Sequence, residues 1–282
     1  MNNVTLGAPL FEDYKSPEQW VSILKRLKYK AAYCPLEIGA KAKDIESYKI
    51  AAQDNNIIIA EVGAWSNPIS INDKERADAI DKNIKSLELA ERIEANCCVN
   101  ISGTKHPEKW AAPHKDNLTS ETFDLIVETT QKIIDAVNPK YTYYTLEAMP
   151  WAYPNSINSY LKLIKAIDRK HFAVHLDPVN LISSPEIYFS NGTFIKKCFK
   201  KLGPYIKSCH AKDILLKDNC DLPQFIECQP GLGKLNYSSF LKELSKLNNI
   251  PLLFEHLKTA EQYKNATNYV RSIGKINNIV FS

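Results

Sequence analysis

The chain has 282 residues, of which 44% are hydrophobic and 24% charged, and these fractions are typical of a folded domain and exclude a disordered chain. The formal net charge of +4 comes from lysines that are spread without a dense basic run, so we expect no nucleic-acid partner. The sequence has neither an apolar run long enough for a membrane span nor a signal-peptide pattern in residues 1–11, so we expect a cytoplasmic protein without a membrane partner.

Short apolar runs alternate with longer amphipathic stretches, which is the pattern of repeated βα units around a parallel sheet. The runs are almost continuously apolar, as expected for strands that are buried on both faces. Helix patterns lie between them, for example over residues 72–95 and over residues 156–168. The second of these begins with a Ser cap at residue 156. The eight expected strands span residues 4–8, 31–36, 57–62, 97–101, 141–147, 172–177, 206–210 and 251–255.

Eight βα units predict an α/β fold, a single (β/α)8 TIM barrel that forms one domain over residues 1–282. The rival fold is a doubly wound open sheet. That fold normally carries a glycine-rich turn for a nucleotide after its first strand, and residues 9–12 read Pro-Leu-Phe-Glu. The sequence therefore favours the barrel.

The last four predicted strands all end on a side chain that can bind a metal, namely Glu147, Asp177, His210 and Glu255. In a barrel, inward-facing side chains at the carboxyl ends of the strands converge on the axis. Three carboxylates at close range would repel one another unless a cation neutralised them, so the cluster predicts one bound divalent metal. Three oxygen ligands and one imidazole favour Mn²⁺, and Mg²⁺, Co²⁺ or Zn²⁺ would also fit.

Over nearly its whole length the chain resembles the xylose isomerase-like TIM-barrel family, in particular its sugar isomerase and epimerase branch, with ketose 3-epimerases and inosose dehydratases. The resemblance implies that Glu147 and Glu255 act as the catalytic acid and base in addition to binding the metal. The segments that carry it are Leu-Glu-Ala-Met-Pro-Trp at residues 146–151, His-Leu-Asp-Pro at 175–178, Cys-His-Ala-Lys-Asp at 209–213, Pro-Gly-Leu-Gly at 230–233 and Phe-Glu at 254–255.

Residue types and resemblance together predict a metal-dependent sugar isomerase or epimerase that transfers a proton through a metal-stabilised enediolate on a small ketose or polyol-derived substrate. A lyase that dehydrates an inosose or a 3-keto sugar starts with the same proton abstraction and remains the alternative. Asn180 stands where endonuclease IV and many epimerases carry a His, so an AP-endonuclease-like phosphodiesterase is less expected. Ketose 3-epimerases often place an Arg beyond the metal His, whereas this chain has none between Arg169 and Arg271. A non-catalytic binding barrel is also less expected.

Further polar and aromatic residues near the strand ends are candidates for contacts with a sugar. For Glu61, a plain salt bridge is as plausible an interpretation as a contact with the sugar. For His175, which should face the interior one layer below the metal, the alternative is a buried histidine bonded to a neighbour. For Lys212 it is an ion pair with Asp213 or Glu227. The candidates are Glu61, Trp65, Trp151, His175, Asn180 and Lys212. We therefore expect a small-molecule sugar as partner, and the resemblance allows a homo-oligomer.

Overall fold

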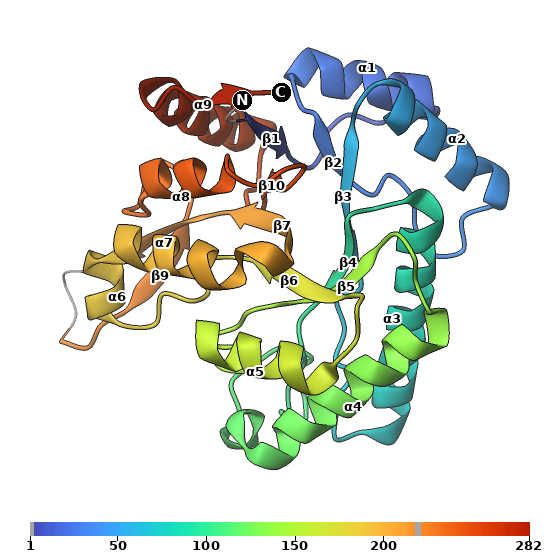
Figure 1. Ribbon diagram of the computed structural model, residues 1–282, viewed down its shortest axis with the longest axis vertical. Helices are drawn as coiled ribbons and strands as arrows, with labels where there is room; N and C mark the ends of the chain where they lie inside the picture. The colour runs from blue at the N-terminus through green and yellow to red at the C-terminus, as the bar shows by residue number, and fades with distance from the viewer. Residues whose placement is uncertain (1–2, 218–220) are drawn as a thin grey trace.

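The eight apolar runs form eight parallel strands wrapped by helices, which confirms the predicted (β/α)8 barrel (Figure 1). The structure is a computed structural model and describes residues 3–217 and 221–282. Within those residues, the sheet runs in the order β11-β1-β10-β7-β6-β5-β4-β3-β2. Its strands are β1 (Asn3–Gly7), β2 (Ala31–Tyr33), β3 (Ile58–Gly63), β4 (Cys97–Asn100), β5 (Tyr143–Glu147), β6 (Phe172–Leu176), β7 (Ile206–Ala211), β10 (Pro251–Phe254) and β11 (Val280–Phe281).

The barrel closes where β1 meets β2. The amide of Lys30 donates to the carbonyl of Leu6 at 3.1 Å across this seam. A Cβ at Gly7 would lie 2.5 Å from the carbonyl oxygen of Ala31, so only glycine allows the two strands to approach this closely. The two-residue strand β11 pairs with β1 and brings the two ends of the chain together (Figure 1).

Helices cover the outside of the barrel, and their starts follow the sequence signals. Asn72 accepts a hydrogen bond from the amide of Glu75 at the start of α3, and Ser156 forms a capping box with Ser159 at the start of α5. The helices are α1 (Pro17–Leu27), α2 (Ala42–Asp54), α3 (Asp73–Ile93), α4 (Ser120–Val137), α5 (Ile157–Ile167), α6 (Pro185–Phe189), α7 (Asn191–Leu202), α8 (Tyr237–Leu244) and α9 (Ala260–Ile276), with 3-10 turns η1 (Lys115–Leu118) and η2 (Gly203–Tyr205). In the described part of the chain, none has both the length and the apolar character of a transmembrane helix.

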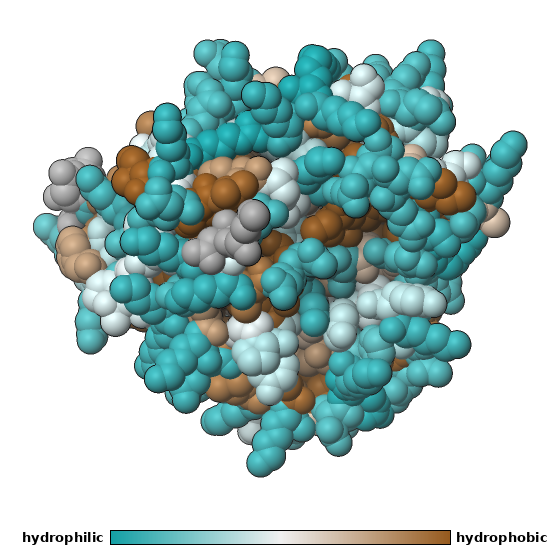
Figure 2. Space-filling model, turned by 45° about the horizontal axis from the view of Figure 1, so that its top comes forward, coloured by the Kyte–Doolittle hydropathy of each residue, from teal (hydrophilic) through white to brown (hydrophobic). Residues whose placement is uncertain are grey.

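Apolar side chains between the sheet and the helices form the main core. A second, small cluster of Ala31, Ala60 and Leu253 fills part of the space inside the barrel. The surface is mostly hydrophilic on the face drawn in Figure 2, with hydrophobic side chains gathered near its middle. Polar residues toward the carboxyl ends of the strands, among them Glu61, His175 and His210, are buried as well.

Two β-bulges aim polar side chains into the barrel. On β3, Ile59 pairs with Ala32 and Glu61 with Tyr33, so Ala60 is an extra residue. On β7, Ile206 pairs with Val174 and Ser208 with His175, so Lys207 is extra. Because a bulge breaks the strict alternation of faces, Glu61 points inward beside Ala60, and Ser208 and His210 point inward although Ile206 belongs to the outer core.

A feature that we did not predict is an antiparallel hairpin of β8 (Asp213–Leu216) and β9 (Phe225–Cys228) directly after β7. In sequence, β8 follows β7 with only Lys212 between them, so the apolar residues of β8 look like an extension of the barrel strand. The hairpin instead leaves the barrel and carries Glu227 toward the carboxyl ends of the strands, where its carboxylate lies 3.5 Å from the ammonium of Lys212.

Candidate active site and metal centre

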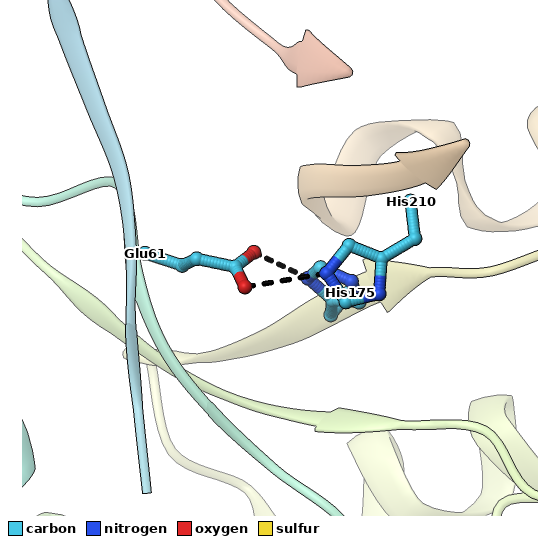
Figure 3. A group of neighbouring side chains, drawn as sticks. All are labelled: Glu61, His175 and His210. Carbon is cyan, nitrogen blue, oxygen red and sulfur yellow. Dashed lines mark hydrogen bonds and ion pairs between the residues drawn. The ribbon is translucent and has the colours of Figure 1, made fainter. Parts of the chain in front are cut away.

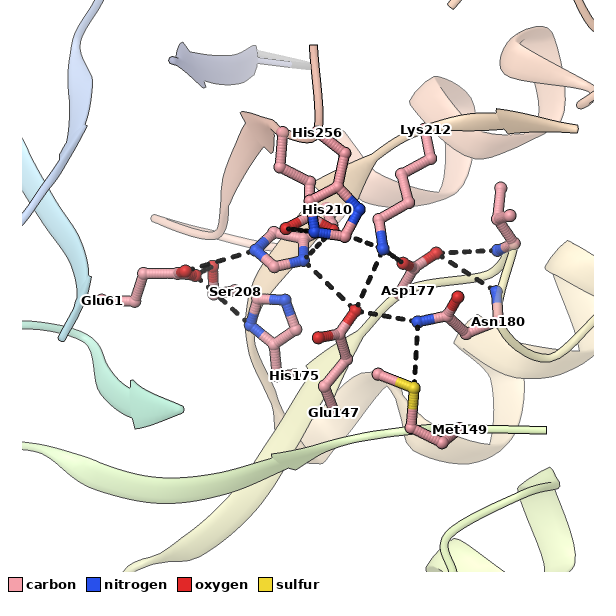
Figure 4. A network of polar contacts seen from close by, with 12 residues as sticks. Glu61, Glu147, Met149, His175, Asp177, Asn180, Ser208, His210, Lys212 and His256 are labelled. Atoms are coloured by element: carbon pink, nitrogen blue, oxygen red, sulfur yellow. Dashed lines mark hydrogen bonds and ion pairs between the residues drawn. The ribbon is translucent and has the colours of Figure 1, made fainter. Parts of the chain in front are cut away.

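The four predicted metal ligands, Glu147, Asp177, His210 and Glu255, lie together at the carboxyl end of the barrel. Figure 4 shows the first three of them side by side. One ligand atom from each residue lies within 4.8 Å of the ligand atoms of the other three, and all four side chains are buried. Glu147 ends β5 and His210 belongs to β7, while Asp177 and Glu255 directly follow β6 and β10. The strand ends of consecutive βα units therefore converge as barrel geometry requires.

The ring of His210 is held so that its two nitrogens face different partners. Nδ1 lies 2.8 Å from Glu255 Oε1 and 3.4 Å from Glu147 Oε1, on the side of the candidate metal centre. Nε2 lies 3.2 Å from Glu61 Oε1 on the opposite side (Figure 3). Glu61 can accept the proton of Nε2, so loss of the proton on Nδ1 would make the Nδ1 lone pair available to a metal, which is the arrangement that carboxylates give to metal-binding histidines.

A second layer of polar residues lies beneath His210. Ser208 donates to Glu61 Oε2 at 3.1 Å, and His175 Nδ1 lies 3.4 Å from the same oxygen. His175 is completely buried, and its ring centre is 4.0 Å from that of His210. Burial lowers the pKa of His175 to about 4, so its imidazole is neutral at pH 7. This place, one layer below the ligands, favours the buried alternative that the sequence left open over a direct contact with substrate.

Asn180 and the turn after β6 orient two of the carboxylates. Asn180 Nδ2 donates to Glu147 Oε1 at 2.9 Å. Asp177 Oδ1 accepts the amide of Val179 at 2.8 Å and that of Asn180 at 3.4 Å, which leaves Oδ2 directed at the centre of the cluster. Asn180 therefore supports two ligands, and its predicted contact with substrate stays a prediction.

The ammonium of Lys212 lies among the carboxylates. Its Nζ is 2.5 Å from Glu255 Oε1, 2.9 Å from Asp177 Oδ2 and 3.5 Å from Glu147 Oε1, and the side chain is 2% exposed. From the sequence, Lys212 is a candidate substrate contact, with an ion pair to Asp213 or Glu227 as the alternative. The structure adds three partners from the metal cluster, and the pairing with Glu227 holds as one of four.

These ion pairs set the charge of the site. Although burial opposes ionisation, Lys212 holds the pKa of Glu147 well below its ordinary value, and His210 lowers the pKa of Glu255 to about 2. Burial raises the pKa of Asp177 to about 7. Despite the burial, Glu255 and Glu61 hold the pKa of His210 well above its ordinary value. Both glutamates are thus ionised at pH 7.

A cavity of about 580 Å³ opens beside the cluster, a volume within the range of small-molecule sites. Glu147 and Glu255 line it together with Trp65, Trp110 and Trp151. Two of these tryptophans are predicted substrate contacts, and their faces supply apolar surface against which a sugar ring could stack.

His256 also lines this cavity and was not identified from the sequence. Its backbone φ of 57° is unusual for a residue other than glycine, and its Nδ1 lies 2.9 Å from Glu227 Oε1. The hydrogen bond with Glu227 raises the pKa of His256. Its position directly after the strand-end Glu255 is the signal that would have pointed to it.

The donor set fits a divalent cation. Asp177 Oδ2 and Glu255 Oε1 are buried and meet only ion-pair contacts, without a well-aligned hydrogen-bond donor. Carboxylate oxygens in that condition are available to a hard cation, and the imidazole adds one nitrogen. Glu147, Asp177, His210 and Glu255 would hold the ion, provided that the ammonium of Lys212 moves aside.

The chain belongs to the xylose isomerase-like TIM barrel family, whose sequence profile matches residues 17–274. No curated protein matches the chain. Fold and strand-end ligands therefore agree with the family that the sequence motifs suggested.

Solved structures with the same fold are similar to the chain over nearly its whole length. D-psicose 3-epimerase from Clostridium cellulolyticum H10, determined with D-tagatose, is 14% identical and superposes with a TM-score of 0.68 over 96% of this chain and 99% of that chain. The probable 3-DHS dehydratase AsbF from Bacillus anthracis is 14% identical with a TM-score of 0.68, over 96% and 98%. A xylose isomerase-like TIM barrel protein from Mycobacterium smegmatis in complex with magnesium is 15% identical with a TM-score of 0.65, over 98% and 96%. At these identities the likeness shows the fold alone.

Proposed function

We propose that this protein is a metal-dependent sugar isomerase or epimerase, which moves a proton at a carbon next to the carbonyl of a small ketose or polyol-derived substrate. The observation that carries the proposal is the placement of two ionised glutamates, Glu147 and Glu255, in one four-residue ligand set that borders a cavity lined by tryptophans. Neighbours in fold include both an epimerase and a dehydratase, so the family likeness supports enediolate chemistry without choosing its outcome.

The residues of the chain take distinct parts in this reaction. Trp65 and Trp151 would pack on the sugar and exclude water from the cavity. The bound ion, with Mn²⁺ favoured, would polarise the carbonyl and stabilise the enediolate. A carboxylate oxygen of Glu147 or Glu255 takes the proton from carbon. Delivery of a proton to the opposite face by the other glutamate, which takes that proton from solvent before the step, gives an epimer, and return of the first proton to the neighbouring carbon by the glutamate that removed it gives an isomer.

His256 favours elimination as a second candidate function. Its imidazole lines the cavity, and its Nε2 lies 3.5 Å from Glu255 Oε2. Because the hydrogen bond with Glu227 raises its pKa, the protonated ring is available to donate a proton to a departing hydroxyl. A lyase acting on an inosose or a 3-keto sugar would use Glu255 as the base and His256 as the acid.

Deuterium exchange tests the proposal. The Mn²⁺-loaded protein is incubated with a panel of ketoses, inososes and 3-keto sugars in deuterated water, and products are analysed by NMR and mass spectrometry. We expect deuterium at a carbon next to the carbonyl of at least one sugar. Loss of a water mass would assign the lyase, whereas retention of mass with a new stereocentre or carbonyl position would assign the epimerase or isomerase.

Glu255→Gln and Glu147→Gln are the test variants, because Gln keeps the shape of the side chain but neither accepts a proton nor supplies an anionic ligand. We expect the exchange rate to fall by about 10²–10⁴-fold in each variant, the usual contribution of a general base. Absence of exchange with every sugar, or undiminished exchange in both variants, contradicts the proposal.

A further inference from the structure

We propose that Lys212 is an internal cation that takes the place of the metal in the metal-free protein and turns to Glu227 when a metal binds. The inference rests on the proposed metal dependence and adds a competitor within the site itself. Its consequence is that the affinity of the protein for metal is set by the exchange of two cations.

The geometry supplies the first argument. The Nζ atom of Lys212 contacts the carboxylates of Asp177, Glu255 and Glu147 at 2.9, 2.5 and 3.5 Å. These are three of the four candidate ligands, and Figure 4 shows the ammonium of Lys212 beside the carboxylates of Asp177 and Glu147. A divalent ion held by the same oxygens would need the space next to the ammonium, and two cations cannot share it.

The cost of charge burial supplies the second argument. Three carboxylates with little exposure would repel one another strongly if no cation lay among them. The ammonium relieves this repulsion, so the pocket keeps its shape before a metal arrives. The backbone carbonyl of Lys212 accepts the hydroxyl of Tyr237 at 2.7 Å, which fixes the base of the side chain, and the four-carbon stem beyond it has several rotatable bonds.

A second position for the ammonium lies within reach. Glu227 on β9 offers Oε2 at 3.5 Å from Nζ and is not one of the four candidate ligands. Glu227 is partly exposed and also pairs with His256 Nδ1 at 2.9 Å. A small rotation of the lysine stem exchanges the three ligand carboxylates for Glu227, so the hairpin provides the counter-charge for the displaced ammonium.

With this competition, the apparent affinity for metal equals the intrinsic affinity multiplied by the fraction of molecules in which the lysine has moved away. If the ammonium occupies the cluster in nine molecules of ten, its removal tightens metal binding about tenfold. The sign is opposite to that expected for a lysine that merely supports the fold, whose loss would weaken binding.

The test compares Mn²⁺ affinity by isothermal titration calorimetry in the wild type, Lys212→Met and Lys234→Met. Lys234 is an exposed lysine of the following loop and serves as the control for charge removal. Measurements in about 0.5 M KCl screen long-range electrostatics, because the Debye length is then only a few ångströms. We expect Lys212→Met to bind Mn²⁺ at least tenfold more tightly than the wild type, and Lys234→Met to stay within twofold of it.

Thermal unfolding gives a second readout. Lys212→Met without metal should melt at a lower temperature than the wild type, and Mn²⁺ should raise its melting temperature more than it raises that of the wild type. Unchanged or weaker affinity in Lys212→Met overturns the inference while leaving the proposed metal dependence intact. Failure of both proteins to bind Mn²⁺ at millimolar concentration overturns the metal dependence itself, and the inference with it.

If Lys212→Met does not fold without metal, Glu227→Gln tests the proposed exchange instead. This variant keeps the lysine and removes the charge that receives it, so we expect Mn²⁺ binding to weaken by about threefold to tenfold. Affinity equal to or tighter than that of the wild type would overturn the exchange.

Discussion

Asp177 and Asp213 are both completely buried aspartates near the carboxyl ends of neighbouring strands, yet their surroundings differ. Burial raises the pKa of each. Asp213 accepts four backbone amides at 2.8–3.0 Å, those of Ile214, Gly231, Gly233 and Leu235. Asp177 accepts backbone amides on one oxygen only, and its other oxygen faces Lys212 at 2.9 Å.

Asp213 therefore has a structural role, whereas Asp177 keeps one oxygen available for a ligand. Asp213 ties the Pro-Gly-Leu-Gly loop to the start of β8, and a Cβ at Gly233 would lie 2.3 Å from its Oδ1, which explains the glycine in that motif. Its oxygens have no capacity left for a ligand. The oxygen of Asp177 that lacks a backbone partner points into a charged cluster, where a cation can bind it.

Asp177→Asn should have the largest effect, and on function. The amide removes one anionic ligand, and since a catalytic metal contributes several kcal/mol, we expect metal-supported deuterium exchange to fall by about 10³-fold. Calorimetry should show weaker Mn²⁺ binding. Stability of the metal-free protein should change little, because the pKa of about 7 already leaves Asp177 partly neutral at pH 7. Wild-type exchange rates in this variant would contradict its role as a ligand.

Asp213→Asn should reverse this pattern. An amide cannot accept from all four backbone donors, so buried N–H groups lose their partner and the free energy of unfolding should fall by about 3 kcal/mol. Urea unfolding measures the loss. Mn²⁺ affinity of the folded fraction should stay within a few-fold of the wild type, and a fall as large as that in Asp177→Asn would erase the distinction between the two aspartates.

Much of the fold was predictable because each strand is a short apolar run and each helix a separate amphipathic stretch. The predicted Ser156 cap marked the start of α5 correctly, and the helical pattern that begins at residue 72 starts one residue before α3. The β8–β9 hairpin was missed, since its first strand continues the apolar text of β7. β11 was missed because two residues carry no periodic signal.

The composition of the candidate site was predictable to the extent that it depends on strand ends. Glu147, Asp177, His210 and Glu255 meet as barrel geometry requires. If faces alternated strictly from Ile59 and Ile206, which belong to the outer core, Glu61 and His210 would also point outward. They point inward because of the bulges at Ala60 and Lys207, which arise from pairing with neighbouring strands and are not visible in the sequence. The position of the Lys212 ammonium depends on side-chain rotation, which a sequence pattern does not encode.

Glu61→Gln extends the comparison to a carboxylate that we expect to act through the candidate ligand His210. Glu61 contacts His210 Nε2 at 3.2 Å, and replacing such a partner typically lowers metal affinity by about 10–100-fold. Calorimetry with Mn²⁺ measures this change. The ¹⁵N chemical shifts of His210 should also show a change of tautomer, which loss of packing alone would not produce. Unaltered affinity and unaltered shifts would leave Glu61 as a plain ion-pair partner.

Glu91→Gln should have the smallest effect. Like Asp213, Glu91 accepts several backbone amides, but it is more exposed. On α3, Glu91 accepts the amides of Lys140, Tyr141 and Thr142 at 2.9, 3.0 and 3.1 Å. Although burial opposes it, these bonds lower the pKa of Glu91 below its ordinary value of 4.5. The variant should be about 1 kcal/mol less stable at pH 7.

The pH dependence of that difference follows from the direction of the shift. A carboxyl whose folded-state pKa is lowered stabilises the fold fully above its unfolded-state pKa, and the stabilisation disappears as the pH falls through the folded-state value. Urea unfolding of the wild type and Glu91→Gln at pH 7 and at about pH 3.5 should therefore show a gap that narrows in acid. A stability difference that stays constant with pH would mean that the backbone donors bind the neutral carboxyl as well as the carboxylate. The negative charge would then contribute little to the stability that a carboxyl gains by accepting several backbone amides.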